Sequence, residues 1–176
     1  MKEEIHVGTS REMRDLGREL AGLLKAGDIV ILSGPLGAGK TTLTQGIGEG
    51  LGVRGPVTSP TFVIARVHPV LPNGTTPLVH VDAYRLGSAV ELDDLDLDAD
   101  VDSAVTVVEW GEGLAEGLAR DRLEISIERD DACAAPVDDS PDEPGLSDEP
   151  RTVRITGMGP RWQDIRMTRT GVSDRL

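Results

Sequence analysis

Aromatic residues are scarce in this sequence, which has one phenylalanine, one tyrosine and two tryptophans among 176 residues. A core with so few rings must consist mainly of valine, isoleucine, leucine and alanine. A chain of this length can bury such a core within one domain. We therefore expect a single domain spanning residues 1–176.

Cysteine is almost absent as well. The one cysteine, Cys133, has no partner for an internal disulfide, and one thiol does not make a metal site. No apolar run approaches the roughly 20 residues that a membrane span needs. The first residues, MKEEIHV, lack the basic and apolar segments of a secretion signal. These absences predict a protein of the reducing cytoplasm.

Basic residues are fewer than acidic ones, 18 against 31, and the net charge is −13. Residues 91–102 and 130–150 together hold fifteen acids and no base, whereas the remainder of the chain has 18 bases and 16 acids. Such a surface disfavours direct, tight binding of nucleic acid. The composition of 130–150 predicts a disordered acidic insert. Residues 157–176, with four arginines and two aspartates, are expected to form a basic tail.

What the sequence does contain is an alternation of strand-like and helix-like segments. Thr9 or Ser10 forms a capping box with Glu12, ahead of an apolar stripe with helical spacing that we expect to end at Gly27. A second helix is predicted from about residue 40 to residue 51. Strands are predicted at 4–9, 28–32, 61–67, 77–82, 104–110, 122–128 and 151–156. The pattern indicates an α/β fold with a mainly parallel sheet flanked by helices, whose last two strands form an antiparallel edge.

Residues 33–42, SGPLGAGKTT, contain the pattern Gly-x4-Gly-Lys-Thr of a phosphate-binding P-loop, between an apolar strand and a helix. Glycines allow backbone N–H groups to surround a phosphate at a helix N-terminus. Lys40 is expected to reach the β- and γ-phosphates, and the Thr41 hydroxyl to bind Mg²⁺. Because Pro35 has no N–H, contacts begin at Leu36 or Gly37. The predicted binding residues are Gly37, Ala38, Gly39, Lys40, Thr41 and Thr42.

Two predicted strands end in a carboxylate, at Asp82 and at Glu109. Ligands of open α/β sheets lie at the carboxyl ends of the strands, so we expect both acids near the phosphates. Asp82 would hold Mg²⁺ directly or through water, and Glu109 would complete the metal shell or orient the attacking water. The alternative is that either acid caps the next helix or lies in solvent.

The segment TSPTF, residues 58–62, stands where nucleotide switches place a sensor of the γ-phosphate. Its Thr61 hydroxyl is expected to approach the metal or the phosphate; an ordinary Ser-Pro turn is the alternative. The Asn-Lys-x-Asp segment that commonly reads guanine is missing, because the one asparagine, Asn73, precedes Gly74. ATP is therefore the expected nucleotide.

Taken in order, LGAGKTTLTQGI, SPTF, HVDAYRL and VVEWGE resemble the TsaE (YjeE) family, small bacterial ATPases needed to make threonylcarbamoyladenosine in tRNA. The resemblance covers roughly residues 9–129. It implies the P-loop fold and a Mg²⁺-dependent ATPase that is slow alone. It also implies that the protein acts with the partner proteins TsaB and TsaD, which carry threonylcarbamoyl transfer to adenosine, and meets tRNA only indirectly.

The resemblance also assigns residues. It implies that Lys40 and Thr41 hold phosphate and metal, and that Glu109 is the second metal-site residue. By the same comparison Asp82 lies at the nucleotide and Thr61 falls in the switch-like segment. It adds two contacts to the nucleotide site, Ser10 and Glu112.

Two other activities use the same P-loop. A small-molecule kinase needs an acceptor pocket and usually an arginine-bearing lid, and the sequence shows no acceptor motif. A nucleotide-dependent assembly switch with little turnover is the second alternative, because fold alone does not decide the reaction.

Overall fold

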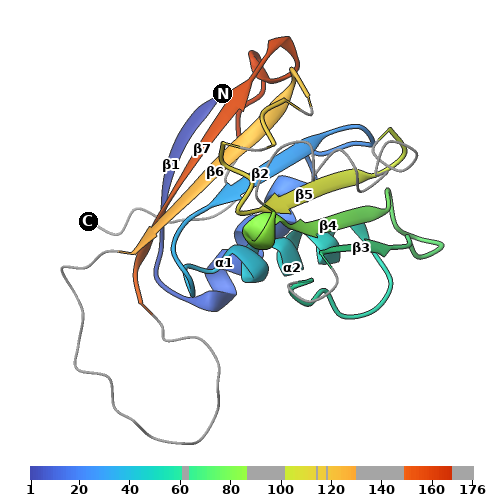
Figure 1. The fold of residues 1–176 in the computed structure, drawn as a ribbon, viewed down its shortest axis with the longest axis horizontal. Coiled ribbons are helices and arrows are strands. Elements are labelled where there is room, and N and C mark those ends of the chain that lie inside the picture. The colour runs from blue at the N-terminus through green and yellow to red at the C-terminus, as the bar shows by residue number, and fades with distance from the viewer. Residues whose placement is uncertain (61–63, 87–101, 114, 118, 130–148, 168–176) are drawn as a thin grey trace, which may run out of the picture.

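The computed structural model describes residues 1–60, 64–86, 102–113, 115–117, 119–129 and 149–167 (Figure 1). Thr61 and most of the two acidic segments lie outside these ranges. The described strands are β1 (Lys2–Val7), β2 (Ile29–Ser33), β3 (Ala65–His68), β4 (Leu78–Asp82), β5 (Val105–Glu109), β6 (Arg122–Arg129) and β7 (Arg151–Met158). The helices are α1 (Ser10–Ala21) and α2 (Lys40–Leu51), with 3₁₀ turns η1 (Ala83–Arg85) and η3 (Pro160–Trp162).

All seven strands join one sheet in the order β1-β7-β6-β2-β5-β4-β3. The four central strands, β6, β2, β5 and β4, run parallel, and the predicted antiparallel pair of β6 and β7 lies toward one edge. The α/β prediction is confirmed. Strand β1 pairs antiparallel with β7 at that same edge. A third antiparallel pair, β3 with β4, lies at the opposite edge and was not predicted. The connection between these strands, residues 69–77, is shorter than the dozen or more residues that a parallel crossover needs.

Helix α1 begins as its sequence predicts and ends earlier. Thr9 is the N-cap, its side chain accepts from the Glu12 backbone N–H, and the Glu12 side chain accepts from the Thr9 N–H in return. The helix ends at Ala21, so the prediction that it extends to Gly27 is wrong. Gly22 closes it, and the Gly27 N–H donates instead to the carbonyl oxygen of Ala104, which ties the chain to the start of β5.

Both helices cover the same face of the sheet, and Figure 1 shows them side by side there. Their apolar residues form one core cluster with alternate residues of the central strands, among them Val30 and Leu32 of β2. Residues Ile29 and Ile31 of the same strand belong to a smaller cluster on the opposite face. Strand β2 is thus covered on both sides, as its continuous apolar run DIVIL predicts.

The contact between α1 and α2 depends on glycine. A Cβ atom built on Gly46 of α2 would overlap the backbone carbonyl oxygen of Arg14 and lie 2.9 Å from its carbonyl carbon. A Cβ on Gly17 of α1 would lie 2.8 Å from the Gly46 Cα. The two backbones therefore meet at a distance that only residues without a side chain permit, and this contact sets the position of the P-loop helix relative to α1.

Parallel pairing brings the carboxyl ends of three strands to one place. Leu32 near the end of β2 is paired with Glu109 at the end of β5, and Asp82 at the end of β4 is paired with the same glutamate. The loop of residues 34–39 leaves β2 at this point and enters α2. Within the described ranges no helix is long and apolar enough to cross a membrane.

Candidate nucleotide site

The loop between β2 and α2 has the conformation that its glycines predict. Gly34 and Gly39 have φ values of +141° and +107°, in the region that side-chain-bearing residues rarely adopt. A Cβ on Gly34 would also lie 2.5 Å from the Ile127 carbonyl oxygen of β6. Gly39 occupies the N-cap of α2, whose first N–H groups have no intrahelical acceptor and therefore suit an anion.

Lys40 lies across this loop. Its ammonium donates to the carbonyl oxygens of Gly34 at 2.8 Å and Pro35 at 2.9 Å. The side chain is only 5% exposed, and its Nζ lies 3.7 Å from the centroid of the Trp110 ring. Burial lowers the pKa of this ammonium, and the charges of Glu109 and Asp82 partly offset that shift. The Lys40 ammonium is thus largely removed from water. In such surroundings it attracts a phosphate more strongly than it would in water.

Thr41 and Glu109 meet across the gap between α2 and β5. The Thr41 hydroxyl lies 3.0 Å from Oε1 and 3.3 Å from Oε2 of Glu109. A hydroxyl and a carboxylate are oxygen ligands of the kind that Mg²⁺ binds together with substrate phosphates. Among the described residues, no group of three or more His, Cys, Asp or Glu side chains could hold a metal ion. One hydroxyl and one carboxylate are a donor set that fits a Mg²⁺ whose remaining ligands come from phosphate and water.

Asp82 both caps the turn that follows it and lines the cavity, two placements that the sequence presented as alternatives. Its Oδ1 accepts from the backbone N–H of Tyr84 at 3.0 Å and so caps η1. Its Oδ2 lies 3.4 Å from the Ser59 hydroxyl. The side chain is 5% exposed and lines the same cavity as the P-loop. The hydrogen bond from Tyr84 to Oδ1 fixes the orientation of the carboxylate, and the group still lines the cavity beside the P-loop.

A cavity of about 410 Å³ opens over these groups. It brings together seven of the predicted residues: Gly37, Gly39, Lys40, Thr41, Thr42, Asp82 and Glu109. The Ala38 side chain is fully buried, and its N–H donates to the Pro35 carbonyl oxygen at 3.1 Å, within the loop itself. Thr61 falls outside the described residues.

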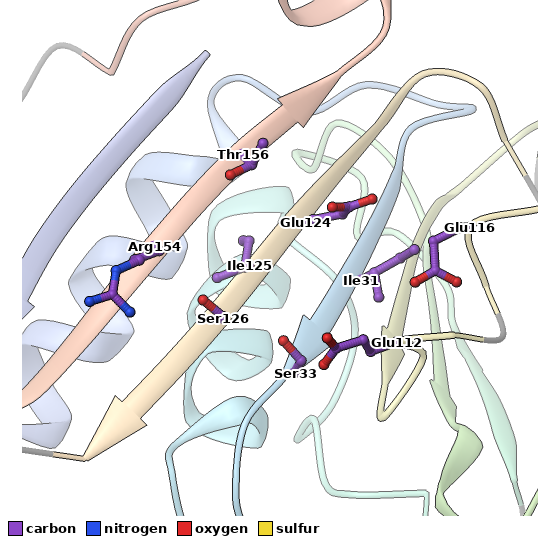
Figure 2. Close-up of a pocket in the computed structure, with 9 residues that line it drawn as sticks. All are labelled: Ile31, Ser33, Glu112, Glu116, Glu124, Ile125, Ser126, Arg154 and Thr156. Atoms are coloured by element: carbon purple, nitrogen blue, oxygen red, sulfur yellow. The ribbon is translucent and has the colours of Figure 1, made fainter.

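Glu112 and Ser10 are not part of that cavity. Glu112 lines a second pocket of about 190 Å³ with Glu116, Glu124 and Ser33. Figure 2 shows Ser33 on β2 and Glu124 on β6, with Glu112 and Glu116 on the segment that follows β5, beside β2. The Ser10 hydroxyl, in the first turn of α1, is buried and has no hydrogen-bond partner among the described residues. Their expected contacts with a nucleotide stay predictions.

Three more residues line the cavity: Leu36, which the sequence offered as a first phosphate contact, Ser59 and Trp110. Ser59 belongs to the same TSPTF segment from which only Thr61 was chosen. Trp110 follows Glu109 directly, lines the cavity and has a φ of +61°, a rare value for a bulky residue. Its backbone N–H donates to the Leu32 carbonyl oxygen at 2.9 Å, which helps to hold that conformation. The sequence indicates this position of Trp110 only through its place directly after Glu109.

A further contact comes from β7, which is separated from β2 by one strand of the sheet. Arg151 begins β7, is 3% exposed, and places Nη2 3.4 Å from the Gly37 carbonyl oxygen. Its Nη1 donates to the Glu149 carbonyl oxygen at 2.8 Å. A buried guanidinium beside the loop adds a fixed positive charge next to the phosphate cradle. The residues next to Arg151 in the sequence do not predict its contact with the Gly37 carbonyl oxygen.

Comparison with known proteins gives a consistent picture. Residues 7–135 match the family model "Threonylcarbamoyl adenosine biosynthesis protein TsaE". The chain is 61% identical over 151 residues to the tRNA threonylcarbamoyladenosine biosynthesis protein TsaE of Streptomyces coelicolor, covering 85% of this chain and 93% of that protein. It is 35% identical over 153 residues to the protein of the same name from Bacillus subtilis, covering 86% and 84%.

A solved structure supports the same likeness. The crystal structure of YdiB from Bacillus subtilis superposes with a TM-score of 0.67 at 30% sequence identity, over 93% of this chain and 90% of that one. Together with the strand, glycine loop and helix described above, this likeness identifies the P-loop fold, which binds nucleotides.

Proposed function

The chain belongs to the TsaE family, whose members take part in threonylcarbamoyladenosine modification of tRNA, and on this basis we propose that it is a Mg²⁺-dependent ATPase supporting that modification. The observation that carries the proposal is the meeting of the Thr41 hydroxyl and the Glu109 carboxylate, 3.0 Å apart, beside the Lys40 ammonium. A phosphate-only site would have no need of a buried carboxylate in contact with the P-loop hydroxyl, because such a charge repels phosphate.

In this proposal, Gly37, Gly39 and Thr42 contribute the loop backbone that surrounds the phosphates. Lys40 leaves the carbonyl oxygens of Gly34 and Pro35 and pairs with the β- and γ-phosphate oxygens. The exchange is favourable because a charge-assisted bond to phosphate is stronger than one to a neutral carbonyl. ATP is the proposed nucleotide, since the chain lacks the common guanine-reading segment.

Thr41 and Glu109 would hold Mg²⁺. The ion, when bound, neutralises charge that develops on the phosphate oxygens. Asp82, fixed by the Tyr84 N–H and next to Ser59, would hold Mg²⁺ directly or through a water molecule, and Glu109 would also be placed to orient the attacking water. Thr61 is proposed as the γ-phosphate sensor, and Ser10 and Glu112 as further nucleotide contacts.

The proposed partners are the proteins TsaB and TsaD, with tRNA bound indirectly through them in the cytoplasm. The net charge of −13 supports the indirect contact, because an acidic surface repels the phosphate backbone of RNA. An ATPase that leaves RNA binding to its partners needs no basic face of its own.

Replacing Glu109 with glutamine is expected to lower ATP hydrolysis by about 100-fold or more, the range seen for a lost catalytic carboxylate. Nucleotide affinity measured without Mg²⁺ should change by no more than about threefold, because the phosphate-binding loop and Lys40 are intact. Phosphate release and titration with a fluorescent ATP analogue measure the two quantities. Glu116→Gln, in the separate pocket of Figure 2, is the matched control. Equal activity of the two variants would contradict the assignment.

Removing the protein from its cell should deplete threonylcarbamoyladenosine from tRNA, measured by mass spectrometry of digested tRNA. The wild-type chain should restore the modification, and Lys40→Ala should not. Unchanged levels after removal would refute the cellular function and leave the nucleotide site untouched. Full restoration by Glu109→Gln despite absent hydrolysis would favour an assembly switch.

Rapid phosphorylation of a metabolite by the purified protein would favour a kinase.

A further inference from the structure

His80 is a fully buried histidine that lies behind the site. It belongs to β4, two residues before Asp82, and its side chain is 0% exposed. Its Nε2 lies 2.7 Å from Oε1 of Glu109 on the neighbouring strand β5. The other ring nitrogen, Nδ1, is buried and has no hydrogen-bond partner among the described residues. The ring therefore makes one polar contact there, and that contact is to a residue of the proposed metal site.

The strand pairing explains how the two side chains meet. His80 is paired with Val107 and Asp82 with Glu109, so His80 and Glu109 are diagonal neighbours on adjacent parallel strands. Diagonal neighbours lie within reach when both side chains are long. Because a carboxylate oxygen only accepts hydrogen bonds, the Nε2 of His80 carries the hydrogen of this contact.

Glu109 Oε1 thus receives two hydrogen bonds, one from His80 at 2.7 Å and one from the Thr41 hydroxyl at 3.0 Å. The histidine donor is held in place, because its ring is fully buried. The threonine hydroxyl can rotate about its C–O bond, and its oxygen has lone pairs for a metal ion, so its hydrogen can turn away from Glu109. His80 is then the contact that keeps the carboxylate oriented toward Thr41.

We propose that His80 is a positioning residue for Glu109, holding one carboxylate oxygen so that the group is already oriented for Mg²⁺. The inference rests on the proposed function of this site. Partners that orient a ligand in this way usually contribute about 10- to 100-fold to metal affinity or activity. A histidine that only fills the core would contribute to stability and leave the metal dependence unchanged.

The test compares side chains that keep or remove the donor. Glutamine carries its Nε2 the same number of bonds from Cβ as histidine does, so His80→Gln retains the donor. His80→Leu removes it, and His80→Asn carries a donor that is one bond too short. The matched control is His68→Leu, because His68 is a buried histidine of β3, 4% exposed, paired with Leu78 at the opposite end of β4 from Asp82.

The first measurement is the Mg²⁺ concentration that gives half-maximal ATP hydrolysis. We expect His80→Leu to raise it by about 10- to 100-fold, with Mg²⁺-free nucleotide affinity unchanged. His80→Gln should recover most of the loss, His80→Asn little of it, and His68→Leu should match the wild type. Equal effects of His80→Leu and His68→Leu, or a glutamine variant no better than leucine, would overturn the proposal.

The second measurement needs neither metal nor nucleotide. Proton–nitrogen NMR of the wild-type protein should show a slowly exchanging ring N–H on the Nε2 of His80, assigned by its loss in His80→Gln, and moved by Glu109→Gln. Absence of that protected signal, or a hydrogen on Nδ1, would overturn the proposal even if His80→Leu fails to fold. If the wild type hydrolyses no ATP, the proposed function fails, and the NMR signal still decides whether His80 holds Glu109.

Discussion

Replacing Lys40 with alanine is expected to lower the affinity for ATP by at least about 100-fold, because charge-assisted hydrogen bonds contribute about 1.5–3 kcal/mol each and Lys40 is placed to make two or more. The ammonium is buried in the loop, in contact with two carbonyl oxygens and the Trp110 ring. The chain has two other lysines, Lys2 and Lys25. Neither lines the cavity, so neither replaces the lost charge.

Calorimetric titration of Mg²⁺ and ATP into the variant measures this loss. A second readout is thermal: at 100 times its dissociation constant a ligand stabilises the folded protein by about 2.7 kcal/mol. That gain should raise the melting temperature of the wild type by roughly 5–10 °C. Lys40→Ala should show no such rise. Lys25→Ala is the control and should behave as the wild type, and an affinity of Lys40→Ala within about threefold of wild type would disprove the role.

Replacing Gly46 with alanine is expected to lower the free energy of unfolding by about 2 kcal/mol or more. The new methyl group would overlap the Arg14 carbonyl oxygen of α1, a backbone atom that no rotamer change can move. Alanine favours a helix over glycine by about 1 kcal/mol, so the measured loss is what remains after that gain. Because α1 and α2 would have to separate, the P-loop helix moves with them, and nucleotide affinity should fall as well.

Urea unfolding followed by circular dichroism measures the change. Gly117→Ala is the matched control: Gly117 has no atom within 4 Å of an added Cβ and lacks a left-handed φ, so its substitution should be nearly neutral. A Gly46→Ala variant as stable as Gly117→Ala would mean that the helices can separate without cost. The close approach would then not be what positions the P-loop.

The parts of the fold that depend on neighbours in sequence were predictable. The capping box at Thr9 and Glu12 and the helix Lys40–Leu51 were both predicted from short patterns. The end of α1 was not, because Gly22 and Gly27 are equally good stop signals, and the choice between them depends on the bond from the Gly27 N–H to Ala104 in a distant strand. Local chemistry permits both ends, and only the tertiary contact selects one.

The candidate site divides in the same way. Lys40, Thr41, Asp82 and Glu109 were identified from residue type and from their place at strand ends, because glycine loops, buried strands and terminal carboxylates are local features. The contacts among these residues, in contrast, could not be predicted from the sequence. Thr41 reaches Glu109 across 68 positions, His80 reaches the same carboxylate across 29, and Arg151 reaches the loop across 114.

By itself, then, the amino-acid order determined the elements, the phosphate-binding loop and the acids that follow the strands. Only the tertiary structure decided that β5 lies between β2 and β4, and hence that Glu109 faces both the P-loop and His80. It also decided that Glu112 lines another pocket, three residues beyond Glu109. Strand order is set by the summed packing of both sheet faces, and no short stretch of residues encodes that sum.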